Sequence, residues 1–510
     1  MVRPSLHIVN SHIIQLSRDI IMSNPTSDNG PRALRPRPDP AKSGIDIKLD
    51  QHWSSKAYTS GSKVTGNVII NTQRDVVFDG FEIFFTGIAY TRIDFISQYS
   101  SANYASRPFM KLRMPLSRSD LPSTGVFEAG RTYTIPFNFV VPHQLTLSAC
   151  NHSVEHAGIK DRHLQLPPTM GFWERNDQSP DMAHIEYAIR AVAHKETSEE
   201  GRTLPLDGFH MIKVLPAVPE DAPLDIGPND ERYCLSKTKP IRKNLFTTKQ
   251  GELKTTASQP SAIMLSGNFL KASGTNLKVN LEFNSTSKDV TPPKINSVSA
   301  KIHSTTFFSS APMNHLPNLG PRIKHQSSPS LTYSNTTPVP MRPDTRLTWE
   351  DEAPASRRDS GYDSGFWNES ESSETEGHHS KKANKYNVRR YATLDIPFNL
   401  PTNGNKLFLP TFYSCISARA YIINLTLSVG PMNTNINLNV PVQVAVEDTY
   451  SQQDDDELPS FDAAIAEAEE ADVDFHLQPR LMQVPSARFQ GTSTLPGYED
   501  MQMRHQVAVA

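Results

Sequence analysis

Cysteine is scarce in this chain of 510 residues, which contains only Cys150, Cys234 and Cys415. Because these residues are odd in number and far apart, they argue against a disulfide framework and favour a reducing compartment. Long apolar runs are also missing, since no stretch approaches the roughly 20 apolar residues that span a bilayer. We therefore expect a soluble, cytosolic protein.

Catalytic signatures are missing as well. The sequence contains no G-x-S-x-G elbow, no P-loop, no G-x-G-x-x-G turn and no H-E-x-x-H pair. The net charge is only −3, so no global field attracts nucleic acid or a membrane, and any such attraction must be local. We expect no catalytic residues, no cofactor and no nucleic-acid partner. An enzyme of β-sandwich fold is the least favoured class.

The N-terminal segment lacks the features of a secretory signal. Residues 1–22 are mildly apolar, but charged residues such as Arg18 and Asp19 interrupt them, and no small-residue cleavage site follows. A mitochondrial presequence is the alternative for this segment. Met22 is an alternative start, because MSNPTSDNG opens a polar leader.

Apolar and polar residues alternate in two stretches of the chain, as half-buried strands require. In residues 45–216, one face of a strand carries Tyr133, Ile135, Phe137, Phe139 and Val141. In residues 259–447, a similar face carries Leu277, Val279, Leu281 and Phe283. Each stretch has room for about seven or eight strands, so we predict an all-β chain of two tandem β-sandwiches.

The remaining ranges show no sustained alternation of apolar and polar residues. Residues 1–44, 311–386 and 448–510 are rich in polar residues, proline or charge, which predicts a disordered leader, a long disordered insertion in the second sandwich and a disordered acidic tail. A surface loop tolerates such an insertion because closure entropy grows slowly with length. Residues 217–258 begin with spaced prolines and become basic, so we predict a linker there.

Several segments together resemble a known fold. They are YTSGSKVTGNV at 58–68 and, within 133–195, YTIPFNFVVPHQL, LQLPPTMGFWERN and MAHIEYAIRAVAHKE. This set resembles the N-terminal domain of the arrestin fold, in the α-arrestin branch common in fungi. Residues 260–310 and 391–446 match more weakly, mainly through PTFYSCISARAYIINLTLSV. The resemblance implies two tandem arrestin-like, immunoglobulin-type β-sandwiches.

The resemblance also implies a function. Members of this family are adaptors that bind cytosolic segments of membrane transporters or receptors. They recruit ubiquitin ligases with WW domains, and so promote ubiquitination and endocytosis of the cargo. The chain is then expected in the cytoplasm, peripherally at the plasma membrane or endosomes. The alternative is a signalling or trafficking scaffold, built on the same sandwiches, that recruits no ligase.

The ligase contact that the resemblance implies is Pro-Pro-x-Tyr, which this chain lacks; that absence favours the scaffold. The tail instead contains LPGY, with Leu495, Pro496 and Tyr498 as the candidate WW-binding residues. Proline presets an extended backbone, and a WW groove accepts the proline and tyrosine rings. Chance occurrence, or a Tyr-x-x-Φ signal for clathrin adaptors, is the alternative.

A degenerate second copy of this motif lies upstream, with Leu458, Pro459 and Phe461. Phenylalanine fills a tyrosine pocket but leaves its polar partner unpaired, so we expect weaker binding there. Two sites on one flexible tail would gain avidity.

Two other groups of residues are candidate sites. Ser360 and Ser364 follow Arg357-Arg358, and their phosphorylation would add roughly −3 to −4 charges; an unmodified polar linker is the alternative. The predicted linker carries Lys237, Lys239, Arg242 and Lys243. These cations form a candidate contact with acidic cargo or an anionic membrane, where each contributes about 1 kcal/mol. The alternative is a solvated linker.

One cluster resembles a set of metal ligands. It consists of Cys150, His152, His156 and His163. Its Cys-x-His-x3-His-x6-His spacing is not a standard zinc pattern, and no C-x-x-C accompanies it. From the sequence we therefore assign no metal site.

Overall fold

A computed structural model describes residues 44–93, 103–197, 201–227, 230–244, 248–267, 271–320, 330–341, 343, 346–351, 388–402 and 404–448. All of these residues belong to one compact unit. Almost all of the predicted leader and tail, and residues 352–386 of the predicted insertion, lie outside the described residues. In the part that the structure describes, no helix is both long and apolar enough to cross a membrane.

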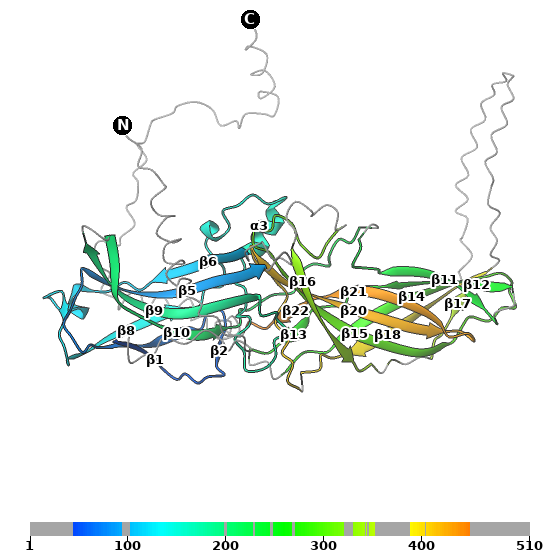
Figure 1. Cartoon of the computed structure of the whole chain (residues 1–510). Helices are drawn as coiled ribbons and strands as arrows, with labels where there is room; N and C mark the ends of the chain where they lie inside the picture. The colour runs from blue at the N-terminus through cyan, green and yellow to red at the C-terminus, as the bar shows by residue number, and fades with distance from the viewer. Residues whose placement is uncertain are drawn as a thin grey trace, which may run out of the picture. The chain divides into compact units, whose positions relative to one another are not determined.

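Strands between residues 45 and 214, called here the first β region, form two main sheets (Figure 1). The strand orders are β1-β3-β8 and β2-β10-β9-β5-β6, and β4 pairs with β7 as a short ribbon. The bounds are β1 Ile45–Leu49, β2 Ala57–Tyr58, β3 Lys63–Asn71, β4 Val76–Val77, β5 Gly80–Ile93, β6 Asn103–Arg113, β7 Val126–Phe127, β8 Thr132–Val140, β9 Ala183–Thr197 and β10 Gly201–Val214.

The predicted alternation in the first β region is confirmed. Strand β8 buries Ile135, Phe137 and Phe139, and exposes the residues between them. The ring of Phe139 lies 5.9 Å from that of Phe85 on β5, measured between centroids. Because β5 and β8 belong to different sheets, the two sheets pack face to face on a shared apolar core.

Strands between residues 236 and 446, called here the second β region, also form two main sheets. One has the order β11-β12-β14-β18-β17; the other has the order β16-β15-β20-β19, with β21 paired to β20, and β13 pairs with β22. The bounds are β11 Ser236–Arg242, β12 Lys249–Ala257, β13 Ile263–Leu265, β14 Thr275–Ser285, β15 Ile295–Phe308, β16 Leu331–Val339, β17 Glu350–Asp351, β18 Val388–Phe398, β19 Phe412–Tyr413, β20 Ser417–Val429, β21 Thr434–Val442 and β22 Val444–Val446.

In the second β region, buried and exposed residues alternate along the strands in the same way. Strand β14 buries Leu277, Val279, Leu281 and Phe283, as the sequence predicts. Four strands fall where we expected none: β11 and β12 lie in the predicted linker, and β16 and β17 lie in the predicted insertion. Strand β11 is an edge strand, where Pro240 is tolerated, and the first four residues of β16 are exposed. Neither strand carries a clear apolar alternation.

Helical structure is sparse. The described residues contain one α-helix, α3 (Ala157–His163), and the 3-10 turns η1 (Arg118–Asp120) and η2 (Leu147–Ala149). The described part of the chain is thus mostly β-sheet, in agreement with the predicted all-β class.

The two β regions share no sheet among the described strands, but loops connect them. Arg419 at the start of β20 is fully buried. Its Nη1 and Nη2 donate to the carbonyls of Asp177 (3.0 Å) and Gln178 (3.3 Å), and its Nε donates to Thr306 Oγ1 (2.9 Å). We call this set the Arg419 network. A further hydrogen bond joins the two regions, in which Thr91 Oγ1 donates to the Ser309 carbonyl at 2.7 Å.

Candidate functional site

The predicted motifs of the tail and the insertion fall outside the described residues. These are Leu458, Pro459, Phe461, Leu495, Pro496, Tyr498, Ser360 and Ser364. The WW-ligand and phosphorylation hypotheses therefore stay predictions.

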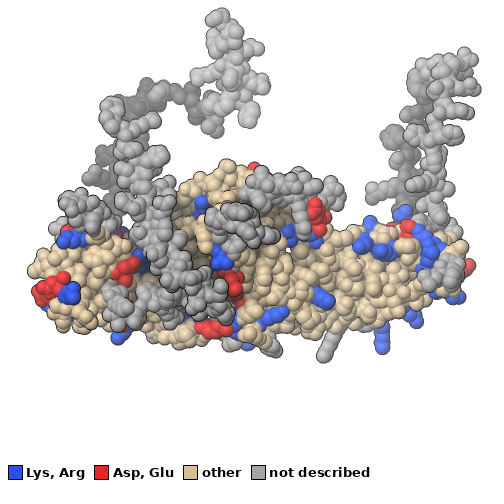
Figure 2. Space-filling view, in the orientation of Figure 1, with Lys and Arg blue, Asp and Glu red and all other residues tan. Residues whose placement is uncertain are grey.

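The predicted basic residues lie on and just after the edge strand β11. Lys237 and Lys239 are half-buried on the face that also carries buried Ile241, whereas Arg242 is exposed on the opposite face and Lys243 follows the strand. Figure 2 shows lysine and arginine side chains gathered over the part of the surface where β11 and β12 lie. The cations are thus spread over both faces of an exposed edge.

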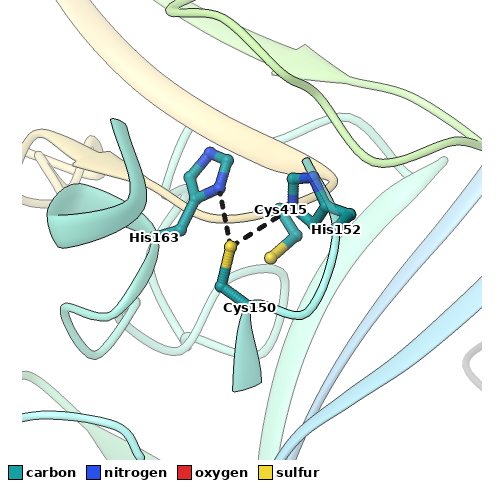
Figure 3. A group of neighbouring side chains, drawn as sticks. All are labelled: Cys150, His152, His163 and Cys415. Atoms are coloured by element: carbon teal, nitrogen blue, oxygen red, sulfur yellow. Dashed lines mark hydrogen bonds between the residues drawn. The ribbon is translucent and has the colours of Figure 1, made fainter. Parts of the chain in front are cut away.

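A second group of candidate side chains converges between the two β regions (Figure 3). Cys150 and His152 lie in the irregular segment after η2, and His163 is the last residue of α3. Cys415 lies between β19 and β20, in the second β region. We call these four residues the Cys–His cluster. Figure 3 shows their side chains pointing toward one another.

Helix α3 aims His163 inward. Ile159 and His163 are one turn apart, and they are the two buried residues of the helix. Between them, Arg162 forms an ion pair with Asp221 at 2.6 Å, and its guanidinium lies 5.4 Å from the centroid of the Tyr413 ring. Because Tyr413 belongs to β19, these contacts hold α3 against the strand that precedes Cys415.

Distances within the Cys–His cluster are short. Cys150 Sγ lies 3.5 Å from His152 Nε2 and 3.6 Å from His163 Nδ1. One ligand atom from each of the four residues lies within 4.8 Å of the other three. Cys150, His163 and Cys415 are buried, and His152 is half-buried.

Burial controls the protonation of these groups. It lowers the pKa of His163 to about 4, with further lowering from nearby His152 and Arg107. It also lowers the pKa of His152, against a hydrogen bond to the Ser153 carbonyl that raises it. Burial raises the pKa of the Cys415 thiol to about 11, an effect that Arg107 opposes. Both imidazoles are therefore neutral at pH 7, and each keeps a lone pair.

Neutral imidazoles beside thiols permit two kinds of chemistry. A cysteine in contact with a histidine is the pair used in nucleophilic catalysis, but such a nucleophile must meet its substrate. Cys150 is only 1% exposed, so this arrangement disfavours catalysis. Two sulfurs and two ring nitrogens are also the donors that soft or borderline metal ions prefer.

The structure changes the membership of the cluster that the sequence suggests. His156 is exposed and is not among the converging side chains, and Cys415 takes its place. No local pattern could reveal Cys415, because it lies 266 residues from its neighbour Ala149. Only the contact between the two β regions brings it to the other three residues.

A hollow of about 150 Å³ lies beside α3, lined in part by Arg162, Asp221 and Glu220. Arg162 and Asp221 are ion-paired, and Glu220 accepts a hydrogen bond from the Ala262 N–H. These charged groups are engaged in holding loops together.

Comparison with known proteins adds no assignment. No model of a known protein family matches this chain, and a search of curated proteins found no match.

Proposed function

We propose that this chain is an arrestin-like trafficking adaptor. It binds cytosolic segments of plasma-membrane transporters or receptors and recruits a WW-domain ubiquitin ligase, which leads to ubiquitination and endocytosis of the cargo. The supporting observation is the tandem arrangement of two β regions, each built from two main sheets with no sheet shared among the described strands. That arrangement is what two successive sandwiches would produce, the second beginning before residue 259 because β11 and β12 belong to its sheet.

In this proposal the two sandwiches and the tail have separate tasks. The sheet edges β6 and β11, which have no further neighbour among the described strands, would offer backbone groups and side chains to a cargo segment. The cations of β11 would add attraction to acidic cargo or to an anionic membrane. The motif of Leu495, Pro496 and Tyr498 would bring the ligase to the cargo at the plasma membrane or endosomes.

The decisive experiment measures binding of isolated ligase WW domains to the full chain, with three variants. Tyr498→Ala removes the ring that fills the WW pocket, and Phe461→Ala removes that of the second motif. Tyr450→Ala is the matched control, since it removes a tyrosine that no Leu-Pro precedes. We expect roughly micromolar binding that Tyr498→Ala abolishes, Phe461→Ala weakens and Tyr450→Ala leaves unchanged. Undiminished binding by the Tyr498→Ala chain would refute the ligase assignment.

The second candidate is a signalling or trafficking scaffold that recruits no ligase. The specific observation in its favour is the absence of Pro-Pro-x-Tyr from the sequence. Cargo binding by the full chain together with no WW binding would select this function. Loss of cargo binding on charge reversal of Lys237 and Lys239, with WW binding intact, would assign the two tasks to different parts of the chain.

A further inference from the structure

We propose that Cys150, His152, His163 and Cys415 form a closed, structural zinc site that fastens the segment after β8 to the β19–β20 connection. This inference is independent of the adaptor function. It assigns a metal to a place where the sequence alone gave none.

The donor set fits zinc. Structural zinc sites use four protein ligands from cysteine and histidine, and Cys2His2 is a common combination. All four candidate ligands here are of these two types, and three of the four are buried. A catalytic zinc keeps one position open for water or substrate. Four converging protein ligands leave no coordination position open for water or substrate. The expected role of this site is therefore structural.

The spacing of the ligand atoms also fits zinc. Zn–S bonds of about 2.3 Å and Zn–N bonds of about 2.05 Å, at tetrahedral angles, place sulfur and nitrogen ligands about 3.6 Å apart. The two sulfur–nitrogen distances from Cys150, 3.5 Å to His152 and 3.6 Å to His163, agree with this value. The complete set lies within 4.8 Å, so side-chain shifts of about 1 Å would complete the tetrahedron.

A hydrogen bond selects the ring nitrogen of His152 that faces the cluster. Its Nδ1 lies 3.1 Å from the Ser153 carbonyl, to which it donates when it carries the ring proton. The proton is then absent from Nε2, the atom that lies beside Cys150 Sγ. Metal-binding histidines are commonly oriented in this way, with the second nitrogen bonded to a backbone carbonyl.

The surroundings hold the ligands in place and supply charge. Arg107 Nη2 donates to Asn151 Oδ1 at 2.8 Å and contacts the Ala149 carbonyl at 3.5 Å, so it clamps both neighbours of Cys150. Cys415 Sγ lies 3.9 Å from the same Ala149 carbonyl. Two thiolates neutralise one Zn²⁺, and binding would release the two thiol protons to solvent. The guanidinium of Arg107 places a positive charge beside the two neighbours of Cys150.

A disulfide between Cys150 and Cys415 is the competing chemistry. It would form one S–S bond, release two protons and pass two electrons to an oxidant, and it would need neither histidine. The oriented His152 and the inward His163 favour the metal. The two cases differ in the mass of the chain, since a disulfide removes two hydrogen atoms.

The test uses the full, untagged chain purified from zinc-sufficient medium, with metal measured by inductively coupled plasma mass spectrometry. We expect roughly one zinc per chain. Cys150→Ser, His163→Gln and Cys415→Ser should lose it. The matched controls Cys234→Ser and His156→Gln should retain it, because Cys234 lies outside the cluster and His156 is exposed. Wild-type chain with well under one zinc, or equal zinc in the cluster and control variants, would overturn the proposal.

Two measurements on the wild-type chain do not depend on the folding of a variant. Replacement of the metal by Co²⁺ should give tetrahedral d–d bands and a thiolate-to-cobalt charge-transfer band; an octahedral spectrum without charge transfer would refute the site. Chelation should raise hydrogen exchange in 147–164 and 411–418 but not in β11 and β12. An intact mass lower by two hydrogen atoms in zinc-free chain would assign the sulfurs to a disulfide instead.

Discussion

Two of the contacts that join the first and second β regions differ in what completes them. In the Arg419 network, all three guanidinium nitrogens donate to oxygen atoms of the protein, so the contact is complete as it stands. In the Cys–His cluster, the contacts between Cys150 Sγ and the two imidazoles are longer, at 3.5 and 3.6 Å. Buried polar atoms need strong partners. The first contact therefore requires nothing further, and the second is suited to a bound cation.

The largest effect is expected from Arg419→Met. The substitution keeps most of the side-chain volume but removes three hydrogen bonds and leaves the Asp177 and Gln178 carbonyls without that donor. By analogy with broken buried charge contacts, we expect a loss of about 3–5 kcal/mol in the free energy of unfolding, measured by urea denaturation. The control Arg74→Met removes an exposed arginine and should change stability by less than about 0.5 kcal/mol. Equal effects would show that the network contributes nothing.

Removal of the metal should have the next largest effect. A ligand present at about 1,000 times its dissociation constant stabilises the native state by about 4 kcal/mol. We expect a chelator to lower the melting temperature of the wild-type chain, and added Zn²⁺ to restore it. The melting temperature of the Cys150→Ser variant should not change with the chelator. A drop of the same size in Cys150→Ser would place the responsible metal elsewhere.

The sequence predicts the strands where one face is buried and the other is not. In β8 and β14 the requirement for burial imposes a period of two, and Phe137 or Leu281 can be placed from the pattern alone. Strand β11 was missed because three of its residues are basic and Pro240 interrupts it; edge pairing tolerates both. Strand β16 was missed because only Thr337 and Val339 are buried in it.

The Cys–His cluster shows the complementary limit. Cys150, His152 and His163 stand close together in sequence, and their residue types alone suggest metal ligands. The same rule also selects His156, which the structure leaves exposed. Cys415 joins them only through the packing of α3 against β19, which no local spacing encodes. The sequence thus predicts which residue types could bind a metal, whereas the tertiary structure determines which residues come together.

A smaller effect is expected at Gln178, which supports the Arg419 network. Its side chain donates to the Leu407 carbonyl at 3.0 Å and accepts from Ser304 Oγ at 2.9 Å. Gln178→Ala should destabilise the chain by about 2 kcal/mol, because both bonds are buried. The backbone has φ of 60° at this residue, so Gln178→Gly should lose about 1 kcal/mol less than the alanine variant. The free energies of unfolding of the two variants, measured by urea denaturation, separate the contribution of the side-chain hydrogen bonds from that of backbone strain. Identical free energies for the alanine and glycine variants would exclude strain.

The smallest effect is expected from Thr91→Val, which tests whether a separate polar contact between the β regions acts independently of the Cys–His cluster. The change keeps the shape of a buried side chain and removes only the bond to the Ser309 carbonyl. We expect a loss of about 1 kcal/mol, whereas Thr203→Val, at an exposed bond to the Lys195 carbonyl, should cost less. Combined with Cys415→Ser, the two losses should add within about 0.5 kcal/mol if each contact stabilises the junction independently. A larger discrepancy would mean that the metal site and the polar contacts hold one cooperative junction, and that opening either contact weakens the other.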